Sequence, residues 1–177
     1  MRTGFLIAAL MLALAACTET PEELAPPGPP PPAAYPPSEF RAQDFAWSAE
    51  PGSASIEGDL AFRAGGVRYS CSGGDVILTP ETPWSRRRMT ILYGSASAAD
   101  VAVSVVRARE PSGPRADYAR YVKKATCDDQ DHFSFEGLPA GGWFVITLAK
   151  PVNGPGEAVA VMRRVETRRS VRYITLN

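Results

Sequence analysis

The segment Phe133-Ser-Phe-Glu-Gly-Leu-Pro-Ala-Gly-Gly-Trp-Phe-Val-Ile-Thr-Leu148 contains the clearest structural pattern in this chain of 177 residues. Phe133 and Phe135 alternate with polar residues, as in a strand that buries one face. Gly137 and Pro139 then favour a turn that leads the chain from one sheet to another. The strand after this turn is expected to place alternate apolar side chains in the core, at Phe144, Ile146 and Leu148.

Short alternating runs, separated by Gly and Pro, continue on both sides of this segment. They predict strands at 56–62, 67–72, 76–79, 89–93, 101–107, 118–126, 132–135, 143–149, 158–165 and 171–176. Alanines between 95 and 106 leave a short helix as an alternative, but the alternation of β-branched Val101, Val103 and Val105 favours a strand. The pattern predicts an all-β domain over residues 54–177, a small antiparallel β-sandwich of about seven to ten short strands.

The opening segment also resembles the hallmark of carboxypeptidase regulatory-like domains. Their pattern is an Asp-rich turn, F-x-F, G-L-P-A-G, an aromatic residue and an apolar strand, and the likeness is sharp over residues 128–148. Residues 58–62, 71–74 and 76–80 are similar to the start of the same domain. The resemblance implies an Ig-like or transthyretin-like sandwich that acts as a non-catalytic folding, docking or carbohydrate-facing module.

A hydrolase within the transthyretin-like fold offers a contrast. The hydroxyisourate hydrolase uses several histidines and ends in Tyr-Arg-Gly-Ser, whereas this chain has one His and ends Ile174-Thr175-Leu176-Asn177. This difference argues against that chemistry.

The N-terminal residues predict where the protein is located. Arg2 precedes an uncharged apolar run from 4 to 16, which is too short to span a membrane and suits a secretory signal. Its end, Leu14-Ala15-Ala16-Cys17, resembles a bacterial lipobox, and the resemblance implies cleavage after residue 16 and lipidation, including palmitate, of Cys17. An ordinary signal peptide or a failed membrane helix is the alternative. In similar lipoproteins, a residue other than Asp after the cysteine, here Thr18, favours the outer membrane.

A linker is predicted between the anchor and the domain, over residues 17–53. Nine prolines fall between 21 and 37, where missing amide donors and fixed φ angles disfavour both helix and sheet. We expect a disordered, semi-rigid spacer that extends by roughly 3 Å per residue.

The two cysteines that remain, Cys71 and Cys127, are expected to form a disulfide. A secreted protein meets an oxidising compartment, and the spacing lacks the Cys-x-x-Cys pattern of a reactive pair.

Charge and composition exclude several functions. The 19 Lys and Arg balance 19 Asp and Glu, which argues against a nucleic-acid partner. A single His and the lack of a Gly-x-Ser-x-Gly motif argue against zinc hydrolases and Ser-His triads. Asp128, Asp129 and Asp131 lack EF-hand spacing and predict an acidic turn beside a surface histidine, His132. No metal and no cofactor are therefore expected.

Basic residues supply a candidate anion site. The C-terminal hairpin contains Arg163, Arg164, Arg168, Arg169 and Arg172. The planar guanidinium suits the phosphate and carboxylate groups of lipopolysaccharide and peptidoglycan. Charged protection of strand edges is the alternative. Three tryptophans, Trp47, Trp84 and Trp143, are candidates for a sugar-stacking platform, although aromatic residues more often lie in the core.

Together these features predict a lipid-anchored envelope protein with a non-catalytic binding or scaffolding domain. Its expected partners are the membrane, through the anchor, and an envelope protein, a glycan or lipopolysaccharide. The alternative is an envelope hydrolase whose two carboxylates meet only through the fold.

Overall fold

The computed structural model describes residues 39–110 and 117–177. The predicted signal segment 1–16, the lipidation residue Cys17 and the prolines between 21 and 37 lie outside the described residues. Within the described ranges, no helix combines the length and the apolar composition needed to cross a membrane.

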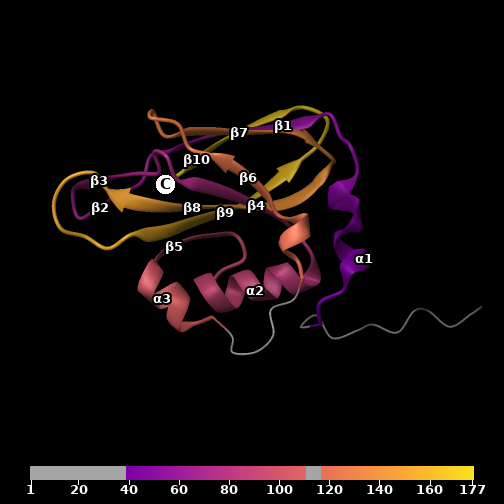
Figure 1. Ribbon diagram of the computed structural model, residues 1–177, viewed down its shortest axis with the longest axis horizontal. Helices are drawn as coiled ribbons and strands as arrows, with labels where there is room; N and C mark the ends of the chain where they lie inside the picture. Colours follow the sequence, from indigo (N-terminus) through magenta and orange to yellow (C-terminus); the bar gives the residue numbers. More distant parts are fainter. Residues whose placement is uncertain (1–38, 111–116) are drawn as a thin grey trace, which may run out of the picture. The chain divides into compact units, whose positions relative to one another are not determined.

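The described residues contain ten strands in two stacked sheets, which confirms the predicted β-sandwich (Figure 1). The smaller sheet contains β10 (Val171–Leu176), β1 (Ala54–Leu60) and β7 (His132–Leu138), in that order. β1 pairs antiparallel with β7 but parallel with β10, which departs from an all-antiparallel arrangement. The predicted C-terminal hairpin was wrong, because β9, the strand before β10, pairs within the larger sheet, while β10 crosses to the smaller sheet and pairs with β1.

The larger sheet is built around its longest strand, β8 (Gly141–Pro151). β8 pairs with β3 (Val67–Ser70), β4 (Asp75–Pro80) and β9 (Val159–Thr167). β6 (Lys123–Thr126) extends the sheet beyond β4, and β5 (Ala98–Ala102) extends it beyond β9. A short β2 (Arg63–Ala64) forms a hairpin with β3.

Strand β8 is buried on both of its faces. Trp143 and Val145 point into the core between the sheets, together with Phe133 and Phe135 of β7. Its other face packs Phe144 and Ile146 beneath a helix, so these two residues are buried as expected. The prediction that Leu148 lies in the core was wrong, because this residue is 46% exposed.

Two segments predicted as strands contain helices. These helices lie on one face of the larger sheet, the face on which Phe144 is buried (Figure 1). Residues 89–93 belong to α2 (Pro83–Tyr93), and residues 101–107 divide between β5 and α3 (Val103–Ala108). The predicted strand at 118–126 is likewise shorter, because a 3-10 turn, η2 (Ala119–Tyr121), precedes β6.

Capping residues explain where α2 begins and ends. The Ser85 amide donates to Thr82 Oγ1 at 3.0 Å, and the Thr82 amide donates to Ser85 Oγ at 2.8 Å, which forms a capping box. Gly94 ends α2 with a left-handed φ of 77°. Ser85, Met89 and Leu92 share one buried helix face. Thr82, Ser85 and Gly94 are therefore local signals for this helix, whereas the strand predicted at 89–93 depended only on a short apolar run.

Residues before β1 also belong to the packed unit. They form α1 (Ala42–Phe45) and a 3-10 turn, η1 (Ala46–Ala49). Phe45 is fully buried, and its ring stacks on Tyr121 at a centroid distance of 5.1 Å. Trp47 packs against Trp143, with ring centroids 5.0 Å apart. The C-terminal part of the predicted linker therefore packs on the sandwich.

Candidate functional site

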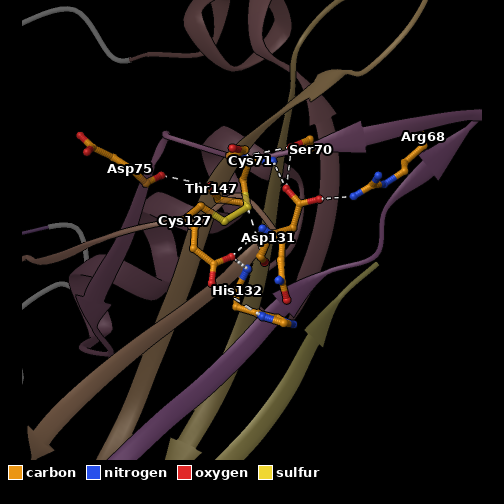
Figure 2. Close-up of a disulfide and its surroundings, with 11 residues drawn as sticks. Arg68, Ser70, Cys71, Asp75, Cys127, Asp131, His132 and Thr147 are labelled. Carbon is orange, nitrogen blue, oxygen red and sulfur yellow. Dashed lines mark hydrogen bonds and ion pairs between the residues drawn. A yellow bond between two sulfur atoms is a disulfide. The ribbon is translucent and has the colours of Figure 1, made fainter.

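Cys71 and Cys127 form the predicted disulfide, with a Cα–Cα distance of 5.7 Å (Figure 2). Both residues are buried, and they join the junction between β3 and β4 to the end of β6. Burial denies a reductant access to the bond in the folded protein. These features indicate a structural disulfide.

The predicted acidic turn is organised by Asp131. Its carboxylate accepts hydrogen bonds from Arg68 Nη2 at 2.7 Å, Ser70 Oγ at 2.6 Å and the Cys71 amide at 2.8 Å (Figure 2). Burial opposes ionisation, but these hydrogen bonds prevail and lower the pKa of Asp131. In the described part of the chain, Cys71, Cys127 and Asp131 form a grouping of metal-capable side chains, but its sulfurs are joined to each other.

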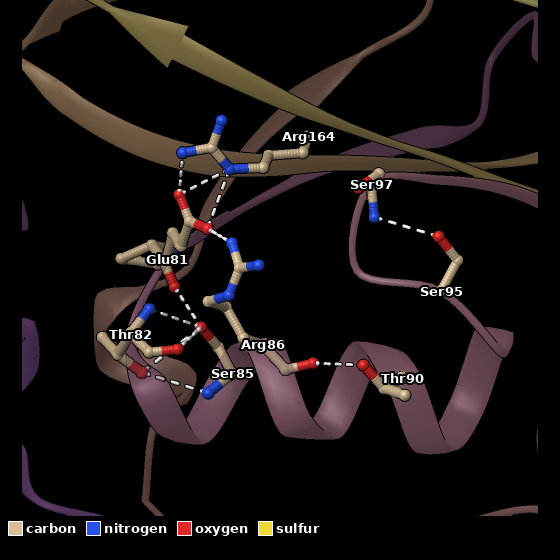
Figure 3. Close-up of polar contacts among 9 residues, drawn as sticks. Glu81, Thr82, Ser85, Arg86, Thr90, Ser95, Ser97 and Arg164 are labelled. Atoms are coloured by element: carbon tan, nitrogen blue, oxygen red, sulfur yellow. Dashed lines mark hydrogen bonds and ion pairs between the residues drawn. The ribbon is translucent and has the colours of Figure 1, made fainter. Parts of the chain in front are cut away.

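The five predicted arginines are distributed over several surface hollows. Arg164 Nε donates to both oxygens of Glu81, which lies just before α2, at 2.8 Å (Figure 3). Arg86 contacts the same carboxylate. Burial of Glu81 raises its pKa, but the hydrogen bonds from Arg164 and Arg86 outweigh burial and lower it overall. A side chain at Gly142 would collide with this network, because a Cβ there would lie 1.8 Å from Glu81 Oε2.

The other four arginines lie on open surfaces. Arg163 and Arg172 line one groove between β9 and β10, together with Arg164 and Glu166. Arg168 lies 3.6 Å from Glu166 and lines a neighbouring hollow with Arg172. Arg169 lines a different hollow, beside residues 51–53 and Pro139.

The tryptophans do not form a common platform. Trp143 is fully buried and donates its Nε1 proton to Thr167 Oγ1 at 3.0 Å. Trp47 covers Trp143, and Trp84 packs edge-on against Phe45 with centroids 6.0 Å apart. The three rings therefore pack in the core or against the segment formed by α1 and η1.

The structure reveals a surface that sequence reasoning missed, the outer face of the sheet β10-β1-β7. Tyr173 projects from it with 76% of its surface exposed. The register places Glu57 beside Tyr173 and Asp59 beside Thr175, with His132 on the far side of Asp59. Thr175 Oγ1 donates to Asp59 Oδ1 at 3.3 Å. We call this surface the Tyr173 face.

A shallow hollow of about 430 Å³ lies on the Tyr173 face. Its lining combines an aromatic ring with two carboxylates, an imidazole and a hydroxyl group, from Glu57, Gly58, Asp59, His132, Tyr173, Ile174 and Thr175. An exposed ring offers an apolar surface to the C–H face of a sugar. The carboxylates are acceptors for hydroxyl donors. The arrangement can therefore bind a polar ring compound without a deep cavity.

Comparison with known proteins shows the fold. No protein-family model matches the sequence, and no curated protein is similar to it. A crystal structure from Pseudomonas aeruginosa, of a protein described as a "putative carbohydrate binding protein", has a TM-score of 0.58 to this chain. The two sequences are 22% identical, over 78% of this chain and 97% of that one. At this identity the likeness establishes a shared fold.

Proposed function

We propose that this chain is a lipid-anchored protein of the bacterial outer membrane whose sandwich binds an envelope glycan without catalysis. Cys17 at the end of a lipobox-like signal supports the anchor. The Pseudomonas protein shares this fold, and its name as a carbohydrate binding protein supports a carbohydrate ligand. The proposal assigns binding to the Tyr173 face.

The exposed ring of Tyr173 carries this assignment. A large aromatic side chain that is 76% exposed on a sheet face exposes apolar surface without a partner in the described chain. Glu57 and Asp59 lie beside it and accept hydrogen bonds from sugar hydroxyl groups. The docked segment that begins at residue 39 does not cover this face, because Phe40 packs against Trp84 on α2 instead.

The hydrolase alternative concerns the same surface. Glu57 and Asp59 are two residues apart on β1 and line the same hollow, and glycosidases use paired carboxylates. The shallow hollow favours binding, since catalytic sites concentrate polar groups in a concave, water-excluding pocket.

Calorimetric titration of the purified full chain with peptidoglycan and lipopolysaccharide oligosaccharides tests the proposal. We expect Tyr173→Ala to weaken binding at least tenfold, or about 1.4 kcal/mol, through the loss of the stacking surface. Tyr173→Phe keeps the ring and should bind nearly as well. Val152→Ala, another exposed apolar residue that does not line the hollow, is the matched control.

Two outcomes would contradict the proposal. Equal binding by Tyr173→Ala and the control would remove the Tyr173 face from the site. Turnover of a glycan that Glu57→Gln abolishes would establish the hydrolase alternative.

A further inference from the structure

The five arginines between residues 163 and 172 differ in their contacts. Arg164 is neutralised by Glu81, with an Nη2–Oε2 distance of 2.6 Å. Arg163 and Arg172, which come from two different sheets, line a groove of about 450 Å³ between β9 and β10, and Arg164 and Glu166 of β9 line it as well. We call this the β9–β10 groove. The fold, and not their spacing in the sequence, places Arg163 and Arg172 in the same groove.

The β9–β10 groove has an excess of positive charge. Arg163 Nη2 donates to the uncharged side chain of Asn177, at 2.5 Å from Oδ1. Arg172 makes no hydrogen bond or ion pair with the described residues. Arg168 lines the adjoining hollow, 3.6 Å from Glu166, and Glu166 lines both hollows. With Arg164 paired to Glu81, three further guanidinium groups therefore face one acidic side chain. Planar guanidinium donors match phosphate and carboxylate oxygens.

The β9–β10 groove is continuous with the Tyr173 face. Tyr173, Ile174 and Thr175 line both hollows, so β10 is the shared wall between them. A ligand of a few sugar rings can therefore contact both surfaces by crossing this edge strand.

We propose that the β9–β10 groove is the anion subsite of the glycan site, and that the ligand is a glycan with an acidic substituent, phosphate or carboxylate. This inference rests on the proposed function. The charges also orient the ligand. An anionic group over the Tyr173 face would meet Glu57 and Asp59, which repel it, whereas in the groove it meets Arg163 and Arg172.

Matched pairs of oligosaccharides test the inference in the full chain. Pentamannose monophosphate is compared with unphosphorylated pentamannose, and tetragalacturonate with its methyl ester. At least one acidic form should bind five- to tenfold more tightly than its neutral partner, and this preference should shrink as salt is raised. The pair that shows the preference identifies phosphate or carboxylate as the substituent.

Arginine variants locate the subsite. Arg163→Gln and Arg172→Gln should each reduce the preference for the acidic form at least threefold while neutral sugars bind as before. Arg169→Gln, in a separate hollow, and Arg87→Gln, exposed on α2, are the matched controls. Unchanged circular dichroism melting curves verify that the variants fold.

The outcomes separate the two proposals. Equal binding of acidic and neutral forms, with both lost in Tyr173→Ala, would overturn the anion subsite and leave the glycan site standing. A preference that survives both groove variants would also overturn the subsite. If neither acidic nor neutral sugars bind, the proposed function itself fails.

Discussion

Asp131 shows how much one buried carboxylate contributes to this fold. It adopts a left-handed φ of 68° at the start of β7, and it accepts hydrogen bonds from the segment that contains Arg68, Ser70 and Cys71. The turn thereby binds the strand junction that carries the disulfide. A buried acceptor with three donors cannot be removed without leaving those donors unsatisfied.

We predict that Asp131→Asn lowers the free energy of unfolding by about 2–3 kcal/mol at pH 7, since Asn tolerates the same φ but loses the charge. The lowered pKa of Asp131 stabilises the fold above its unfolded pKa, near 4, and this stabilisation is lost as pH falls through the folded pKa. Urea unfolding at pH 7 and pH 3 should therefore show a smaller acid loss in the variant than in the wild type.

Asp129→Asn, at an exposed position in the same turn, is the control and should unfold like the wild type. Identical unfolding curves for Asp131→Asn and Asp129→Asn at both pH values would show that the buried network contributes nothing.

At the scale of elements, the segment formed by α1 and η1 acts as part of the sandwich. Its anchor, Phe45, lies among the rings of Phe40, Trp84 and Tyr121, with centroids between 5.1 and 6.0 Å away. The segment thereby connects the end of the predicted tether to α2 and to the turn before β6. Helices this short are not stable alone and depend on such packing.

Phe45→Ala is predicted to lower the free energy of unfolding by about 3–4 kcal/mol, because it leaves a cavity among packed aromatic rings. Thermal melting followed by near-ultraviolet circular dichroism measures the loss. Glu50→Ala, exposed in the same stretch of chain, should leave the melting temperature unchanged. If both variants melt together, the segment does not contribute to the stability of the domain.

At the scale of the whole molecule, the layers give the domain two different sides. Helices α2 and α3 lie against one side of the larger sheet, and the Tyr173 face lies on the opposite, outer side of the smaller sheet (Figure 1). The described chain begins at residue 39 next to α2, since Phe40 contacts Trp84. Among the described residues, the start of the chain therefore lies at α2 and not on the Tyr173 face.

The proposed lipid anchor gives a prediction for the whole molecule. Cys17→Ser should move the protein from the membrane fraction to the soluble fraction, or block its maturation, because acyl chains provide about 0.8 kcal/mol of membrane binding per buried CH₂. Labelled palmitate should enter the wild type and not the variant. Ser53→Ala, at an exposed position outside the signal, is the control for processing. Membrane association that survives Cys17→Ser would contradict the anchor.

Local sequence patterns were sufficient to predict many of the strands. Phe133 and Phe135 alternate with polar residues and lie in the core as predicted, because a strand's period of two depends only on backbone geometry. The disulfide followed from the number and spacing of cysteines. The sandwich followed from strands punctuated by Gly and Pro. Even α2 had local signals, since Thr82, Pro83 and Gly94 mark its ends.

Contacts between distant residues determined the rest. Because side chains alternate along a strand, the sequence predicts that Tyr173 and Ile174 face opposite ways. The pairing of β10 with β1 determines which of the two is exposed. Glu81, 83 residues away in sequence, neutralises Arg164. Arg163 and Arg172 line the same groove because the two sheets that carry their strands pack together. A functional surface depends on which side chains the packed sheets leave exposed and unpaired, and no local pattern encodes that.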